Sequence, residues 1–318
     1  MNLALVLRTL VALLLAAGSA CAAAPGAAPT RLIPPGVSVG GVRVGSLSAE
    51  PARLRVETAF ARPILIRYRH KTLRITPRQV AAAISVDAAV SSAFAATPRS
   101  AIALPVRFSD TKLDKLVAFL AHRFYRAPRD TEVIGASSAG PQFTTPRAGL
   151  AVKAKTMRAA LAQLLQNGTR APLQLLTKPV APTRTPANFG PVIVITRGAN
   201  TLELFDGPQP GRTFRVATGQ SAYPTPSGLW HIGDMQRNPW WRPPNSAWAQ
   251  GLKPIPPGPG NPLGTRWMGL DAAGVGIHGT NAPASIGYSL SHGCIRMQVP
   301  EAEWLFQHVR LGTPVVIL

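Results

Sequence analysis

Two glycine-rich stretches, GIHGT at residues 276–280 and SHGCIR at residues 291–296, place a cysteine, two histidines and an arginine close together in the sequence. Cys294 is one of two cysteines in the 318-residue chain, and the other, Cys21, lies in a segment predicted to be removed. A lone thiol cannot form an internal disulfide, but near an imidazole it can become a thiolate, which is the nucleophilic form of cysteine. We therefore expect a cysteine acyl-transfer enzyme.

The N-terminal residues 1–24 have the pattern of a secretory signal, with Arg8 before an apolar run at residues 10–17 and a small-residue cleavage site around Cys21. The apolar run is too short to span a bilayer comfortably. Lipidation of Cys21 is a minor alternative, because Gly18 occupies the position where a leucine would be expected. We expect an exported protein of the periplasm or cell envelope, without disulfides in its fold.

The positive charge of the chain is concentrated before residue 190. The net charge is +21, and residues 31–189 hold 24 Lys and Arg against seven Asp and Glu. Such a segment attracts anionic partners, which after export are cell-wall polymers or an anionic membrane surface. A nucleic-acid partner is not expected, since no helix-turn-helix, zinc-finger or aromatic RNA-binding motif is found. The alternative explanation for the charge is the base composition of the genome, because Arg greatly outnumbers Lys and Ala is abundant.

The pattern of the chain predicts two domains. Hairpin and helix signals alternate over residues 31–180, which indicates an α+β domain. Residues 181–189 form a Pro-rich linker, and residues 190–318 read mostly as strands. The loop at residues 238–262 contains three tryptophans, Trp240, Trp241 and Trp248, and we expect it to form a wall of the substrate cleft rather than a purely structural loop.

Thiol catalysis requires a base, a group that orients the base, and donors for the developing oxyanion. His278 can be the base, and the backbone carbonyl of Gly279 can orient it, since no Asp or Asn is obviously placed to do so. Gly293 leaves room for amides that face an oxyanion. Arg296 can bind a substrate carboxylate with two parallel hydrogen bonds.

These residues together resemble the signature of the L,D-transpeptidase (YkuD-like) family of cell-wall enzymes. The segments TPSG at residues 225–228 and NPLG at residues 261–264 are similar to two further segments of that family. The resemblance covers about residues 190–318 and implies a mostly-β, β-sandwich-like catalytic domain that needs no cofactor and no metal.

The family resemblance implies a role for each site residue. Cys294 would attack the third residue of a peptidoglycan tetrapeptide stem, and the thioester would pass to an amine of a neighbouring stem to form a 3→3 cross-link. His278 would act as general base and then acid, and His292, counted with the catalytic residues, would shape the pocket together with Ser291. Carbapenems would acylate Cys294. The residues expected to bind or shape the substrate site are Arg296, Ser291, Gly279, Thr280 and Gly293.

The N-terminal half has a weaker likeness. Residues 33–48 resemble the opening of the domains proposed to bind peptidoglycan in proteins of this family. That likeness implies that residues 31–180 contact the wall, but it identifies no binding residue.

Three alternatives remain open at this point. Water could replace the amine acceptor, which would give an L,D-carboxypeptidase or endopeptidase with the same thiol. The chain could be a non-catalytic cell-wall-binding protein. A zinc site from His278, His292 and Cys294 is disfavoured, because their spacing fits no common zinc-ligand pattern.

Overall fold

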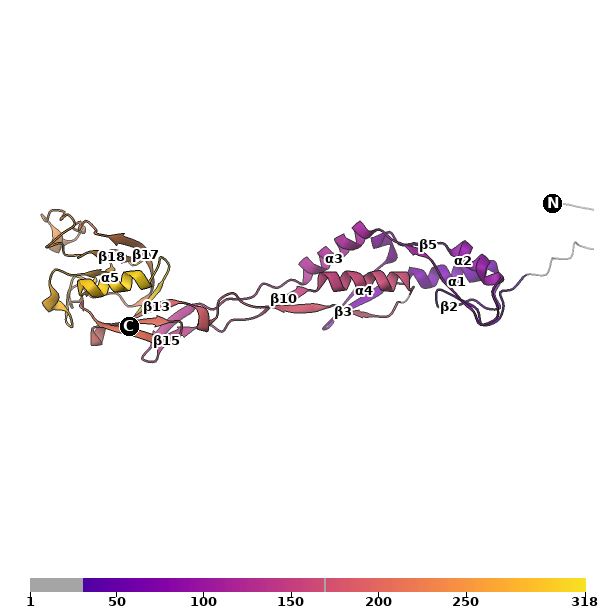
Figure 1. Ribbon diagram of the computed structural model, residues 1–318, viewed down its shortest axis with the longest axis horizontal. Coiled ribbons are helices and arrows are strands. Elements are labelled where there is room, and N and C mark those ends of the chain that lie inside the picture. The colour runs from indigo at the N-terminus through magenta and orange to yellow at the C-terminus, as the bar shows by residue number, and fades with distance from the viewer. Residues whose placement is uncertain (1–30, 169) are drawn as a thin grey trace, which may run out of the picture. The chain divides into compact units, whose positions relative to one another are not determined.

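The computed structural model describes residues 31–168 and 170–318 of the chain. The predicted signal segment at residues 1–24 lies outside the described residues. Within the described part, no helix is long and apolar enough to cross a membrane. The residues form two compact units (Figure 1). The first contains the described residues up to Leu116 together with Arg158–Leu175, and the second contains Val117–Met157 and Leu176–Leu318.

The first unit has small sheets and helices, as the α+β prediction requires. Its apolar core includes Val37, Val56 and Val90, all buried. Strands β1 and β2 form a hairpin around a Gly-Gly pair, and both Gly40 and Gly41 have positive φ angles. The elements wholly within this unit are β1 (Ser38–Val39), β2 (Val42–Arg43), α1 (Ala49–Ala61), β3 (Ile64–Tyr68), β4 (Lys71–Ile75), β5 (Ala83–Ile84), α2 (Val86–Phe94), β6 (Ala101–Ile102), β7 (Val106–Arg107) and β11 (Leu173–Gln174). Helices α3 (Asp110–Phe124) and α4 (Ala154–Gln166) each contain residues of both units.

The second unit is mostly β, which confirms the predicted fold class. Its main sheet has eight strands in the order β15-β14-β13-β22-β17-β18-β19-β21. The bounds of these strands are β13 (Pro191–Thr196), β14 (Thr201–Asp206), β15 (Gln209–Arg215), β17 (Gly228–Arg237), β18 (Arg266–Leu270), β19 (Gly276–Gly279), β21 (Ile295–Met297) and β22 (Pro314–Ile317). The shorter strands are β8 (Val133–Ser137), β9 (Gly140–Phe143), β10 (Gly149–Val152), β12 (Thr177–Val180), β16 (Thr218–Gly219) and β20 (Ser289–Ser291).

Two elements cover the main sheet. Helix α5 (Val299–His308) has Pro300 in its first turn and packs against β18 and β19. The hairpin of β8 and β9 packs against β13, β17 and β22, where Val133 and Phe143 join a small apolar cluster with Phe189. The sheet is therefore buried on both sides over part of its area, and it provides a rigid support for residues on its remaining surface.

Candidate active site

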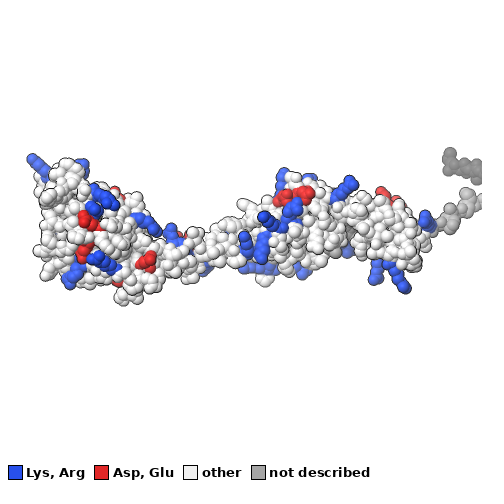
Figure 2. Space-filling model, in the orientation of Figure 1, with Lys and Arg blue, Asp and Glu red and all other residues white. Residues whose placement is uncertain are grey.

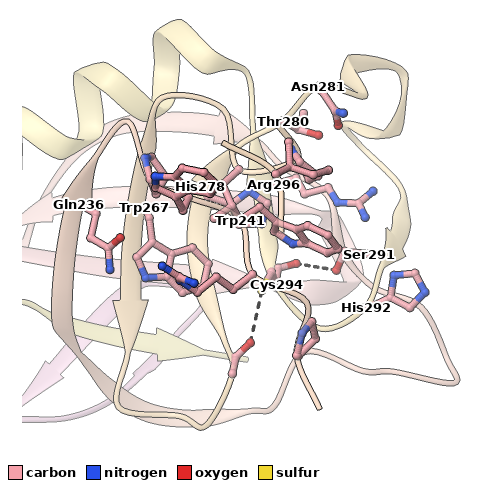
Figure 3. A pocket seen from close by; sticks show the side chains of 18 of the residues that line it. Gln236, Trp241, Trp267, His278, Thr280, Asn281, Ser291, His292, Cys294 and Arg296 are labelled. Carbon is pink, nitrogen blue, oxygen red and sulfur yellow. Dashed lines mark hydrogen bonds between the residues drawn. The ribbon is translucent and has the colours of Figure 1, made fainter. Parts of the chain in front are cut away.

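The candidate site is built on a row of residues that lie in register across four neighbouring strands, β17, β18, β19 and β21. These residues are Gln236, Trp267, His278 and Arg296. Residues paired across adjacent strands point to the same face of a sheet. All four line one cavity of about 1210 Å³ (Figure 3).

The neighbouring row points to the opposite face. Met268, Ile277 and Ile295 are fully buried there in the main core, with Met235 packed against them. Side chains alternate between the faces of a strand, so burial of this apolar row fixes which side chains face the cavity. The register of the sheet therefore places His278 and Arg296 side by side on adjacent strands, facing the cavity.

Trp267 packs flat against the strands because two glycines make room for it. A β-carbon added at Gly276 would lie 2.4 Å from an indole carbon of Trp267, and one added at Gly269 would lie 2.8 Å from its Nε1. Gly269 and Gly276 are paired across β18 and β19. The indole also stacks against His278, with ring centroids 5.7 Å apart. Trp267 thus holds the imidazole plane from one side.

His278 is oriented by its own neighbour in the chain. Its Nδ1 lies 2.5 Å from the carbonyl oxygen of Gly279. A carbonyl can only accept a hydrogen bond, so Nδ1 carries the proton and Nε2 of the neutral ring keeps a free lone pair. The side chain is 4% exposed, and burial lowers the pKa of His278 to about 4. His278 is therefore a neutral imidazole near neutral pH, with Nε2 as its basic atom.

Cys294 lies directly before β21, at the wall of the same cavity. Its thiol donates to the carbonyl of Gly274 at 3.5 Å, and no hydrogen bond joins the thiol to His278 among the described residues. Burial raises the pKa of the Cys294 thiol, which the Gly276 backbone and the charge of Arg296 partly oppose. The resting pair is thus a neutral thiol and a neutral imidazole.

The turn before Cys294 is held by buried hydroxyl groups. Ser291 Oγ donates to the carbonyl of Cys294 at 2.6 Å and accepts from the amide of Gly293 at 3.1 Å. Thr225 Oγ1 donates to the carbonyl of Gly293 at 2.8 Å and accepts from the amide of Gly219. Gly293 has a φ of 112°, which favours glycine. The Gly293 amide is therefore used within the turn, and Thr225 is the residue of the TPSG segment that fixes it.

The second histidine of the motif lies at the rim. The ring of His292 stacks on Trp248, with centroids 4.1 Å apart, and contacts Tyr223. Figure 3 shows this ring turned outward from Cys294. Burial, and then the charge of Arg296, lower the pKa of His292. Its aromatic contacts make His292 part of the cavity wall.

Arg296 is half-buried in the cavity lining, and burial lowers the pKa of its guanidinium. It forms no salt bridge with any carboxylate in the described part of the chain. Its guanidinium is therefore not neutralised by an acidic side chain of the described residues, and a guanidinium can bind a carboxylate through two parallel hydrogen bonds. Within the same residues, no group of three or more His, Cys, Asp or Glu side chains is arranged to hold a metal ion.

The tryptophan-rich loop forms one wall of the cavity, which all three of its tryptophans line. Asn261 is 1% exposed and holds the loop by donating to the carbonyls of Pro239 and Pro256 at 2.9 and 3.0 Å. Thr280 lines the cavity and accepts from the amide of Ala282 at 3.0 Å. The NPLG segment is thus a support for the loop.

Every predicted site residue lies in or beside this cavity, Gly279 and Gly293 through their backbones. Trp267 and Gln236 were missed by sequence reasoning. A signal for Trp267 was present, because side chains alternate between the two faces of a strand. Burial of Met268 in the core therefore places its neighbour Trp267 on the opposite face, toward the cavity. No local pattern pointed to Gln236.

Comparison with known proteins agrees with the geometry. Residues 190–317 match the model of the YkuD family, described as the L,D-transpeptidase catalytic domain. YqjB of Bacillus subtilis, named a candidate L,D-transpeptidase, is 34% identical over 149 residues, which are 45% of this chain and 80% of the relative. YkuD of Bacillus subtilis is 36% identical over 125 residues, 39% of this chain and 64% of the relative.

Among solved structures, an L,D-transpeptidase from Mycobacterium smegmatis is 16% identical over 68% of this chain and 90% of that one, with a TM-score of 0.37. The catalytic domain of the Enterococcus faecium L,D-transpeptidase is 22% identical over 40% of this chain and 96% of that one, with a TM-score of 0.34. On the strength of the sequence matches, the chain belongs to the YkuD family of L,D-transpeptidases.

Proposed function

We propose that the protein is a peptidoglycan L,D-transpeptidase that forms 3→3 cross-links through a thioester on Cys294. The observation that carries this proposal is the hydrogen bond from Nδ1 of His278 to the Gly279 carbonyl. It leaves Nε2 as the basic atom in the cavity that Cys294 also lines. The family membership supports the same reaction class.

In the first half-reaction the Cys294 sulfur attacks the carbonyl of the third residue of the donor stem. The thiol proton passes to Nε2 of His278, and the C–S bond forms. The C–N bond to the terminal D-alanine then breaks, and the imidazolium returns its proton to the leaving amine. We place this proton transfer in the attack step, because His278 and Cys294 are both neutral before the substrate binds.

Arg296 supplies the charge that receives the donor. The donor stem carries carboxylates, and Arg296 has no carboxylate partner of its own in the described residues. A guanidinium forms two parallel hydrogen bonds with a carboxylate. Arg296 lies next to His278 in the register, so a donor held there has its reacting carbonyl near Cys294.

Transfer competes with hydrolysis at the thioester stage. The aromatic wall of Trp240, Trp241 and Trp248 favours transfer, because exclusion of water from the cavity protects the thioester until an amine arrives. An L,D-carboxypeptidase or endopeptidase would use the same acylation step. Mass spectrometry of products from a defined tetrapeptide muropeptide distinguishes them: dimers support transfer, and trimmed monomers without dimers contradict it.

The direct test of the enzyme is Cys294→Ala. The variant should bind muropeptides but form neither dimers nor trimmed monomers, while its circular dichroism stays that of the wild type. Normal cross-linking by the variant would contradict the proposal. Normal binding with no reaction in the wild type would favour the non-catalytic wall-binding alternative.

We also propose that the enzyme acts after export, in the periplasm or cell envelope, and that its first unit binds anionic wall polymers. Arg67 and Arg74 are exposed on β3 and β4, and no acidic residue occurs between Glu57 and Asp87. Figure 2 shows Lys and Arg side chains over this unit. Salt-sensitive binding of the protein to purified sacculi supports this, and binding to anionic vesicles alone would identify a membrane partner instead.

A further inference from the structure

We propose that Asp234, positioned with Gln236, binds the ammonium group of the acceptor stem peptide. The inference rests on the proposed transpeptidase function and adds to it the recognition of the second substrate. Asp234 is exposed on β17, beside the row of site residues described above.

The register of the sheet places Asp234 and Cys294 at opposite ends of one row. Asp234 pairs with Gly269, and Gly269 pairs with Gly276. In the parallel pair of β19 and β21, Ile277 lies opposite Ile295. Cys294 directly precedes Ile295 and therefore continues the row from Gly276, whose backbone acts on its sulfur.

The row between Asp234 and Cys294 carries no side chains of its own. Both intervening residues are glycines, and the indole of Trp267 covers them. A β-carbon at Gly269 would lie 3.4 Å from the β-carbon of Asp234, so the carboxylate begins beside the indole. Trp267 lines the cavity, and an aromatic face attracts a cation. An ammonium group at Asp234 can therefore move across Trp267 toward the thioester.

The cavity lining is positively charged, so a carboxylate beside it is needed to attract an ammonium group. The lining includes three arginines, Arg237, Arg242 and Arg296, and no Asp or Glu among the described residues. Such a lining attracts the donor carboxylates but repels an ammonium group. Asp234 Oδ2 accepts a hydrogen bond of 2.6 Å from Gln236, which does line the cavity. The side-chain amide of Gln236 thus connects Asp234 to the cavity lining.

The other carboxylates near this end of the sheet have partners. Asp271 accepts from the backbone amide of His231 at 2.8 Å and lies 3.2 Å from its Nδ1. Glu303 accepts from Thr265 at 2.7 Å and lies 3.7 Å from Arg266. Asp234 forms no salt bridge within the described residues, so its charge is available to a ligand.

The second half-reaction balances with Asp234 as a binding group only. The captured ammonium group releases one proton to solvent and attacks the thioester carbonyl as a neutral amine. The N–C bond forms, the C–S bond breaks, and the second proton passes through Nε2 of His278 to the sulfur of Cys294. The products are an amide and the free thiol, and Asp234 remains ionised throughout.

The test compares a charged acceptor with an uncharged one. The full-length protein is acylated with a tetrapeptide donor and then offered either a stem-peptide amine or hydroxylamine, which is largely uncharged near neutral pH. Asp234→Asn keeps the shape of the side chain, and Asp234→Lys reverses its charge. Asp206→Asn, at an exposed aspartate at the end of β14, is the matched control.

We expect Asp234→Asn to raise the half-saturating concentration of the stem amine about fivefold, the effect of one exposed ion pair, and Asp234→Lys to raise it further. High salt should reduce the difference. Hydroxamate formation should stay at the wild-type rate, and Asp206→Asn should change neither reaction.

Two results would overturn the assignment of Asp234. One is an equal loss of reaction with the stem amine and with hydroxylamine in the Asp234 variants, which would indicate a structural role. The other is dimer formation by Asp234→Lys at the same acceptor concentration as the wild type requires. Failure of the wild type to form an acyl-enzyme is a different result. It would refute the proposed function itself, and with it the need for an acceptor site.

Discussion

The Gly279 carbonyl and Nδ1 of His278 form a 2.5 Å hydrogen bond within one strand of the main sheet. The strand that delivers the imidazole to the cavity therefore also fixes its tautomer. No separate acidic residue is needed to orient the ring, and none contacts it among the described residues. The base is positioned by backbone that the sheet already holds rigid.

Burial of His278 predicts a specific dependence of stability on pH. Its pKa is lowered from 6.5 to about 4, so the unfolded chain takes up a proton at a higher pH than the folded protein does. The stability that the neutral ring contributes is complete above pH 6.5 and is lost as the pH falls toward 4. Between pH 7.5 and pH 5, this histidine should cost about 2 kcal/mol of unfolding free energy. Urea unfolding of wild type and His278→Gln at both pH values measures it. An equal loss in the two proteins would show that His278 is not the cause.

The raised pKa of Cys294 predicts slow alkylation near neutral pH in the absence of substrate. Burial disfavours the thiolate, so reaction with iodoacetamide should increase only above the range of an ordinary thiol. Arg296→Gln should shift the profile to still higher pH, because the charge of Arg296 lowers the pKa of the thiol. The measurement is the alkylation rate between pH 6 and pH 11 by intact mass. A profile centred near pH 7 would indicate a resting thiolate instead.

The contact between Trp267 and Gly276 predicts a steric effect at a residue that takes no part in chemistry. Gly276→Ala should destabilise the protein by roughly 1–3 kcal/mol, because the new β-carbon overlaps the indole. In a Trp267→Phe background the same substitution should cost less, since the smaller ring leaves room. A double-mutant cycle by urea unfolding tests this coupling. An equal loss of unfolding free energy in both backgrounds would show that the destabilisation does not come from contact with the Trp267 indole.

Thr225 should be needed for its hydroxyl group rather than its size. Thr225→Val leaves the buried carbonyl of Gly293 and amide of Gly219 without this partner and should cost about 1–3 kcal/mol. The turn before Cys294 would shift, so acylation should also slow. Thr225→Ser keeps both hydrogen bonds and should stay close to wild type in stability and acylation rate. Comparable losses in the two variants would indicate packing instead.

The local chemistry of the site could be predicted from the sequence, because it is encoded within short segments. The glycine after His278 indicated a backbone orienter, and apolar alternation indicated the strands that carry the motifs. The resemblance to the family identified TPSG and NPLG, but the structure was needed to show that Thr225 fixes the turn before Cys294 and that Asn261 holds the tryptophan-rich loop.

The register between distant strands could not be predicted in the same way. The pairing of β17 with β18 shifts between Ile232 and Asp234, and this irregularity decides that Asp234 shares a row with Gly269. Cross-strand pairing depends on packing of the whole sheet and leaves little local trace in the sequence. The packing of the β8–β9 hairpin against the main sheet is a contact of the same long-range kind.

The most direct measurement of the central claim is the intact mass of the full-length protein after incubation with a carbapenem, with Cys294→Ala and His278→Ala alongside. The wild type should gain the mass of one carbapenem, Cys294→Ala should gain none, and His278→Ala should gain it much more slowly because it lacks the Nε2 base. Acylation of Cys294→Ala, or an unmodified wild type under the same conditions, would contradict the assignment of Cys294 as the nucleophile.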